Sequence, residues 1–168
     1  MKGWVELYDG QFDLAVQSFS AMHQMDPGNP VFRYLYLMAL AANRQVKEAC
    51  SVVDLIARDT PQIFFAGLGT FLKHAWQGEA DKALKTVSPK WTESARFDET
   101  FSWHVAAGYA LIQKKEEALD WLKNSVSKGM INYPFFSEYC FWFENIREEP
   151  GFKKLMKKVK HEWKNFEV

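Results

Sequence analysis

The chain has 168 residues, of which 48% are hydrophobic and 16% are aromatic. This apolar content suffices for a packed core, and it excludes a disordered chain. The 21 Lys and Arg residues balance the 21 Asp and Glu residues. Because no net charge draws the chain toward phosphate groups, we expect neither nucleic acid nor a membrane surface as a partner of this domain.

The N-terminal residues and the two cysteines indicate a reducing, cytoplasmic location. Residues 1–4 lead directly into a helical pattern, without the apolar core of a signal peptide. The longest apolar stretches, such as residues 34–42, are far shorter than a membrane-spanning helix. Cys50 and Cys140 each stand alone in hydrophobic surroundings, which favours buried thiols over a disulfide or a metal site.

Alanine residues recur along the chain at a nearly constant interval. The interval is 34 residues, and 35 in the last case, for Ala15, Ala49, Ala83 and Ala118. Pro27 and Pro61 keep the same period. This period is typical of helix–turn–helix units that bury their apolar faces by stacking on one another. The sequence therefore predicts an all-α superhelix (an α-α solenoid) of about four units with a C-terminal capping helix.

The repeat pattern also predicts where each unit begins and ends. We expect a single domain with repeats at about residues 1–29, 30–62, 63–98 and 99–131, followed by an aromatic segment and a capping helix at 132–168. Helices are predicted at residues 31–43, 46–58, 63–76 and 80–87 of the second and third units. Since Pro89 stops the last of these helices, residues 90–99 are predicted to form a longer, less regular connection.

The final helix carries an apolar stripe and a basic face. The stripe is predicted to contain Phe152, Leu155, Met156, Val159 and Trp163. The sequence favours a cap that turns this stripe toward the last repeat and its lysines toward water. A patch for acidic partners or lipids is the alternative, but nearby glutamates dilute its charge.

The first unit is shorter than the others. A complete copy would begin several residues before Met1, whereas an array normally opens with a complete unit or a polar cap. We therefore expect this chain to be a C-terminal piece of a longer protein.

Several runs in the second half of the chain carry a family resemblance. They are residues 107–111 (AGYAL), 117–122 (EALDWL), 129–135 (GMINYPF), 152–156 (FKKLM) and 162–168 (EWKNFEV). Together with the 34-residue period, they resemble the C-terminal tetratricopeptide repeat regions of bacterial multidomain signalling proteins, above all serine/threonine protein kinases. Similar tails occur on nucleotide cyclases and winged-helix regulators. The chain departs from this pattern at Arg44, where such tails usually carry glycine.

The resemblance implies a folded interaction tail whose catalytic or DNA-binding domain lies upstream. The residues themselves agree, since no catalytic motif is present. Residues 67–70 lack the third glycine and the preceding strand of a phosphate-binding loop and are interpreted as close helix packing. The four histidines have no neighbouring ligands at metal-binding spacing. We expect no enzyme activity, no metal and no cofactor in this chain.

Binding is the remaining function, and the first helix of each unit is expected to line a concave groove. The predicted groove residues are Tyr34, Met38, Phe65, Leu68, Leu72, Trp103 and His104. This lining is apolar, so it suits an amphipathic helix or an extended segment with hydrophobic anchors. A clamp for a terminal carboxylate is disfavoured, because the positions for its basic residues hold side chains such as Leu35. The same aromatics could instead pack between repeats, and residues 132–143 could fold back and fill the groove.

The sequence is therefore compatible with two functions. The favoured one is a scaffold that binds a protein or peptide partner, or its own upstream domain in cis. The alternative is a structural tail that pairs two copies of the chain as a homodimer through the first unit and its apolar patches.

Overall fold

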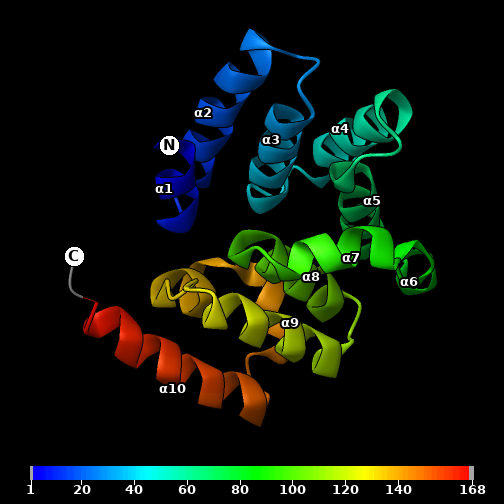
Figure 1. Cartoon of the computed structure of the whole chain (residues 1–168). Coiled ribbons are helices and arrows are strands. Elements are labelled where there is room, and N and C mark those ends of the chain that lie inside the picture. Colours follow the sequence, from blue (N-terminus) through cyan, green and yellow to red (C-terminus); the bar gives the residue numbers. More distant parts are fainter. Residues whose placement is uncertain (1, 167–168) are drawn as a thin grey trace.

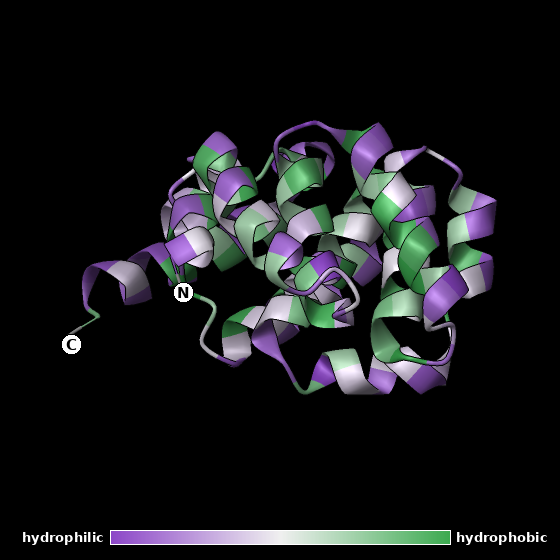
Figure 2. Ribbon diagram, turned by 90° about the horizontal axis from the view of Figure 1, so that it is seen from above, coloured by the Kyte–Doolittle hydropathy of each residue, from purple (hydrophilic) through white to green (hydrophobic). Residues whose placement is uncertain are grey.

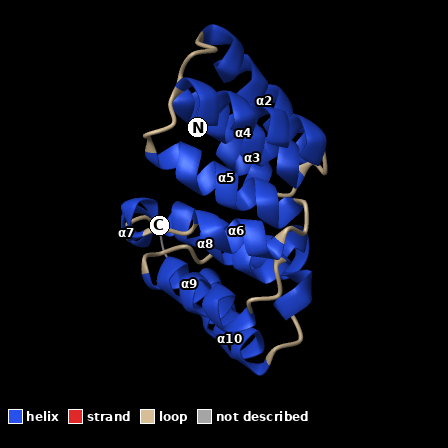
Figure 3. Ribbon diagram, turned by 90° about the vertical axis from the view of Figure 1, so that its right-hand side faces the viewer, coloured by secondary structure: helices blue, strands red, loops and turns tan. Residues whose placement is uncertain are grey.

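The computed structural model describes residues 2–166, and the described residues form only helices, turns and loops. The first helices of four stacked pairs are α1 (Lys2–Tyr8), α3 (Pro30–Ala42), α5 (Phe64–Trp76) and α8 (Glu99–Leu111). Their second helices are α2 (Phe12–Met25), α4 (Val46–Asp59), α6 (Ala80–Thr86) and α9 (Lys115–Ser127). Figures 1 and 3 show the pairs following one another along a superhelix, with α10 (Pro150–Lys164) at its C-terminal end. The predicted fold class is confirmed.

Side-chain caps and residues with positive φ set where the helices begin and where the chain turns between them. The side chain of Asn29 accepts hydrogen bonds from the backbone N–H groups of Val31 and Phe32, and Pro30 occupies the first helical position of α3. In every pair the turn between the two helices contains one residue with positive φ: Gly10, Arg44, Gly78 and Gln113, at 73°, 61°, 72° and 63°. Arg44 thus adopts the left-handed conformation that glycine adopts in the first and third pairs, a conformation that costs about 1–2 kcal/mol for a residue with a Cβ.

The repeated alanines lie in the packed core between the helices. Ala15, Ala49, Ala83 and Ala118 are all completely buried. Gly67 has the same role: a Cβ built there would lie 2.5 Å from a ring atom of Trp91. The interpretation of residues 67–70 as close helix packing is therefore confirmed at Gly67. Small residues recur at the repeat period because larger side chains would push neighbouring units apart.

The prediction of an irregular connection at residues 90–99 is wrong. The chain forms an additional helix, α7 (Pro89–Arg96), which packs against α5, α8 and α9. Pro89 begins this helix, because proline is well suited to a first helical position even though it ends a preceding helix. Trp91 and Ala95 anchor α7 in the core, and the Trp91 indole donates a hydrogen bond to the Thr86 carbonyl at 2.9 Å.

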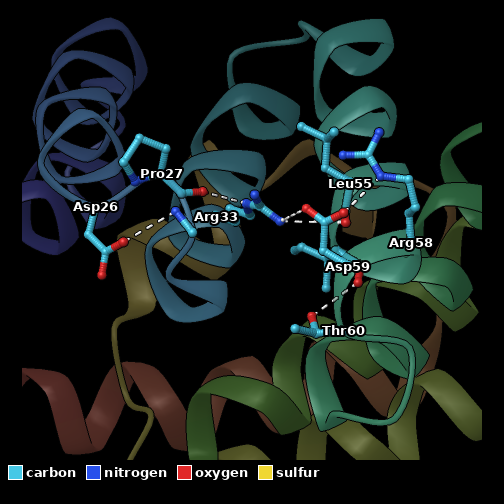
Figure 4. Close-up of polar contacts among 9 residues, drawn as sticks. Asp26, Pro27, Arg33, Leu55, Arg58, Asp59 and Thr60 are labelled. Carbon is cyan, nitrogen blue, oxygen red and sulfur yellow. Dashed lines mark hydrogen bonds and ion pairs between the residues drawn. The ribbon is translucent and has the colours of Figure 1, made fainter.

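A polar network fastens the connection after α2 to the end of α4 (Figure 4). The guanidinium of Arg33 donates to the Pro27 carbonyl at 2.6 Å and pairs with the Asp59 carboxylate at 2.8 Å. Asp59 also pairs with Arg58 at 2.8 Å. Hydrogen bonds from Arg58 and then Arg33 lower the pKa of Asp59 to about 2, so this carboxylate stays ionised in mildly acidic solution. The network fixes the first pair relative to the second.

The C-terminal residues cap the array. α10 packs against α9 and buries Phe152, Leu155, Met156 and Val159. Trp163 departs from the predicted apolar stripe, since its side chain is 45% exposed. Figure 2 shows the C-terminal end of the chain projecting beyond the other helices. Both cysteines are free and buried, as predicted, and burial raises the pKa of Cys140 to about 12.

Gly108 offers a test of the close contact between α5 and α8. A Cβ built at Gly108 would lie 2.3 Å from Cε1 of Phe71, whose ring is completely buried. We expect Gly108→Ala to lower the free energy of unfolding by about 1–3 kcal/mol, because the ring has no free space to enter.

The matched control is Gly69→Ala in the interior of α5. A Cβ there would meet Val53 at an ordinary 3.5 Å, so we expect a stabilisation of about 0.5–1 kcal/mol from the higher helix propensity of alanine. Urea unfolding followed by circular dichroism measures both variants. Equal stability of the two would contradict the tight contact at Gly108.

Candidate functional site

Aromatic side chains from the first helices meet across the concave side of the superhelix. Tyr8 of α1 lies 6.4 Å from Trp103 of α8, measured between ring centroids, and Trp4 lies 6.3 Å from His104. Tyr34 of α3 lies 4.8 Å from Phe65 of α5. Distances this short, including those between the first and the fourth unit, mean that the interior of the superhelix is packed and not hollow.

The structure corrects five of the seven predicted groove residues. Met38, Leu68, Leu72, Trp103 and His104 are at most 1% exposed, and none of them lines a cavity at the groove mouth. They belong to the first helices, as predicted, but the packed interior takes them out of reach of a partner. Tyr34 and Phe65 do line the cavity described below, although Tyr34 itself is 1% exposed.

Tyr34 and His104 form a buried polar pair within this interior. The Tyr34 hydroxyl and His104 Nδ1 are 2.7 Å apart and hydrogen-bonded. Burial lowers the pKa of His104 to about 3, so its imidazole is neutral at physiological pH. The other ring nitrogen, Nε2, is buried without a hydrogen-bond partner among residues 2–166. This hydrogen bond therefore ties α3 to α8, and His104 itself is completely buried.

The segment after α9 fills the remainder of the groove. It contains the π-helix η1 (Phe135–Tyr139) and the 3₁₀-helix η2 (Phe141–Ile146). The Phe135 ring lies 5.0 Å from Tyr8 and 5.0 Å from Trp103. Trp142 lies 6.0 Å from Trp103, and Arg44 stacks on Phe141 at 4.2 Å. The alternative in which residues 132–143 fold back into the groove is confirmed, and these contacts join the last unit to the first.

A cavity of about 520 Å³ opens at the mouth of the concave side. All four first helices contribute to its wall, together with the turn after α9. The lining residues are Trp4, Tyr8, Val31, Tyr34, Leu35, Phe65, Asp98, Glu99, Thr100, Phe101, Gly129 and Met130. Its volume is within the range of small-molecule and side-chain pockets. We call it the mouth cavity.

The wall of the mouth cavity is largely aromatic. The Trp4 and Tyr8 rings are stacked at 5.4 Å with an interplanar angle of 20°. Tyr34, Phe65 and Phe101 form a second group, with centroids 4.8 to 5.9 Å apart. Such packed rings hold their positions without a ligand, so the cavity is preformed.

Two acidic residues lie at the start of α8 beside these rings. Asp98 caps the helix, and its Oδ1 accepts a hydrogen bond from the Phe101 backbone N–H at 2.9 Å. Burial, with a smaller contribution from the charges of Glu99 and Asp98, raises the pKa of Tyr8 to about 12. The cavity thus combines a low-polarity wall with negative charge.

Sequence reasoning missed most of the mouth cavity. Trp4 stands 34 residues before Met38, so the repeat period applied to the predicted groove residues would have found it. Asp98 and Glu99 were missed because residues 90–99 were interpreted as an irregular connection. Asp98 precedes a helix and has the side chain of a helix cap, which was the available signal.

Within residues 2–166, no three His, Cys, Asp or Glu side chains are grouped so that they could hold a metal ion. No described helix has both the length and the apolar composition needed to cross a bilayer.

Comparisons with known proteins support the repeat architecture. A family model described as tetratricopeptide repeat matches residues 6–66. Among solved structures, the chain is similar to residues 41 to the end of MamA from Desulfovibrio magneticus RS-1, with a TM-score of 0.53 and 14% sequence identity. That alignment covers 99% of this chain and 93% of the other, and at this identity it shows a shared fold. No curated protein matches the chain.

Proposed function

We propose that this chain is a protein-interaction module that holds a segment of a partner protein in the mouth cavity. The observation that carries the proposal is the convergence of all four first helices on one preformed, aromatic opening. Aromatic side chains supply large contact area with few rotatable bonds, which is typical of residues that dominate binding energy at interfaces. The tetratricopeptide match over residues 6–66 supports an interaction role.

The proposed setting is that of a non-catalytic, cytoplasmic tail in a bacterial signalling protein. It rests on the resemblance to tails of serine/threonine kinases, cyclases and regulators. In such a protein the partner segment belongs either to a separate chain or to an upstream domain in cis.

We expect peptides selected on this chain to need an open mouth cavity. Val31 lines the cavity and is 43% exposed, so Val31→Trp should obstruct the opening without burying new volume in the core. Peptides enriched from a random display library on the original chain should bind Val31→Trp about tenfold more weakly or worse, as measured by fluorescence anisotropy.

Leu14→Trp is the matched control, since Leu14 is also 43% exposed and lies on α2 away from the cavity. It should leave peptide affinity unchanged. Failure to enrich any peptide, or equal binding to both variants, would contradict a binding role for the mouth cavity.

Exposed apolar residues on the first pair favour homodimerisation as the second candidate. Val5 on α1 is 60% exposed and Leu14 and Met25 on α2 are 43% and 83% exposed. Light scattering over a range of concentrations separates the candidates. A stable dimer that Val5→Lys dissociates would support the structural tail, and a monomer throughout would exclude it for this chain.

A further inference from the structure

The charged residues of the mouth cavity are all of one sign. Among its lining residues only Asp98 and Glu99 carry a charge, and both are partly buried. Neither carboxylate forms an ion pair within residues 2–166, whereas ten other such pairs are present there. No cationic side chain among residues 2–166 neutralises these two carboxylates, so they give the opening a negative charge beside its aromatic wall.

Helix capping uses only one of the four carboxylate oxygens of Asp98 and Glu99. The cap uses Oδ1 of Asp98, which accepts from the Phe101 N–H, and leaves Oδ2 and both oxygens of Glu99 without a hydrogen-bond donor among the described side chains. The field of these groups reaches the aromatic wall. Burial is the main cause that raises the pKa of Tyr34, which lines the cavity from α3. The charge of Asp98 makes a smaller contribution in the same direction.

The aromatic wall supplies the second half of a cation site. The faces of Trp, Tyr and Phe rings carry partial negative charge and attract cations that lie within about 6 Å. The apolar side chains of Val31, Leu35 and Met130 lie in the same wall and suit a methylene stem. A ligand group with an apolar stem and a cationic head would thus satisfy every part of the lining.

We infer that the mouth cavity receives an arginine side chain of the partner, with its guanidinium held by the Asp98 and Glu99 carboxylates against the aromatic wall. The inference rests on the proposed function, since the arginine belongs to the bound protein segment. Guanidinium is favoured over ammonium because it is planar, stacks on aromatic rings and donates forked hydrogen bonds to carboxylates. A carboxylate or phosphate ligand would be repelled by both acidic residues.

The test uses small probes and nuclear magnetic resonance of the whole ¹⁵N-labelled chain. N-acetyl-arginine methylamide is titrated, and the indole N–H of Trp4 and the amide of Gly129 report binding from the cavity wall. N-acetyl-citrulline methylamide has nearly the same shape but no charge. N-acetyl-lysine methylamide has the charge but no planar guanidinium group. We expect saturable shifts with the arginine probe, weaker binding of the lysine probe, and binding of the citrulline probe reduced about tenfold or more.

The matched variants remove charge and keep the fold. Asp98→Asn with Glu99→Gln retains the helix cap, because asparagine caps as well as aspartate does. This double variant should bind the arginine probe about tenfold more weakly or worse. Glu116→Gln with Glu117→Gln removes the same charge from the exposed first turn of α9 and should leave the binding unchanged.

The outcomes separate this inference from the proposed function. If the citrulline or lysine probe binds as tightly as the arginine probe, or if no probe shifts the reporters, the arginine assignment is wrong. If displayed peptides nevertheless bind Val31→Trp more weakly than the original chain, the proposed function would still be supported. If the arginine probe binds as expected but no displayed peptide does, the cation site stands and the proposed function fails.

Discussion

Replacing Trp103 with alanine is expected to lower the free energy of unfolding by about 3–5 kcal/mol, the usual loss for a fully buried large aromatic side chain. Trp103 is completely buried at the point where α8, α1, η1 and η2 meet. The loss should be near the upper end of the range, because the rings around Trp103 belong to four different elements and cannot all collapse into the cavity that remains.

Trp163→Ala is the matched control for this prediction. The same residue type is removed, but from a position that is 45% exposed, so the change should be within about 0.5 kcal/mol. Urea unfolding followed by far-ultraviolet circular dichroism measures both. Because Trp103→Ala itself could prevent folding, Trp103→Phe is measured beside it and should give a smaller loss. Similar stabilities for the variants at the two positions would rule out the packed interior described above.

Acidification should destabilise the protein through His104. The pKa of His104 is about 3 in the folded chain, below the ordinary value of 6.5, so the unfolded state binds the proton first as the pH falls. The free energy of unfolding is therefore unaffected by His104 above pH 6.5 and decreases by about 1.4 kcal/mol per pH unit between 6.5 and 3. Between pH 7 and pH 5 the loss from this residue is about 2 kcal/mol.

His104→Asn isolates that contribution. The asparagine side-chain oxygen takes the place of Nδ1 beside the Tyr34 hydroxyl and does not titrate, so the stability difference between pH 7 and pH 5 should shrink by about 2 kcal/mol. Tyr34→Phe leaves His104 enclosed and should keep the pH dependence. His23 contributes in the same direction, because burial and then the charge of Arg33 lower its pKa, and this contribution is common to all variants. If the free energy of unfolding of His104→Asn depends on pH as steeply as that of the original chain, the imidazole is not held neutral by burial.

The repeat architecture can be predicted from the sequence, because the spacing of small residues is visible without any knowledge of distant contacts. Ala49 lies 34 residues after Ala15 and Ala118 lies 35 residues after Ala83, and all four are completely buried. The predicted helix at residues 31–43 agrees with α3 within one residue at each end, since Pro30 and the Asn29 cap are local signals. The exception is α7: the preceding helix α6 does end before Pro89, but Pro89 also begins a helix that the sequence pattern does not predict.

Which aromatic side chains a partner can reach depends on contacts between segments that are far apart in the sequence. Trp103 is a predicted groove residue, and Phe101 lies two residues before it on the same helix. Trp103 is completely buried because η1 and η2 pack on it, whereas Phe101 lines the mouth cavity. Period and composition show that a residue lies on the inner side of the superhelix. Whether that side is open depends on its curvature and on where the last aromatic segment packs, and both arise from contacts between residues far apart in the chain.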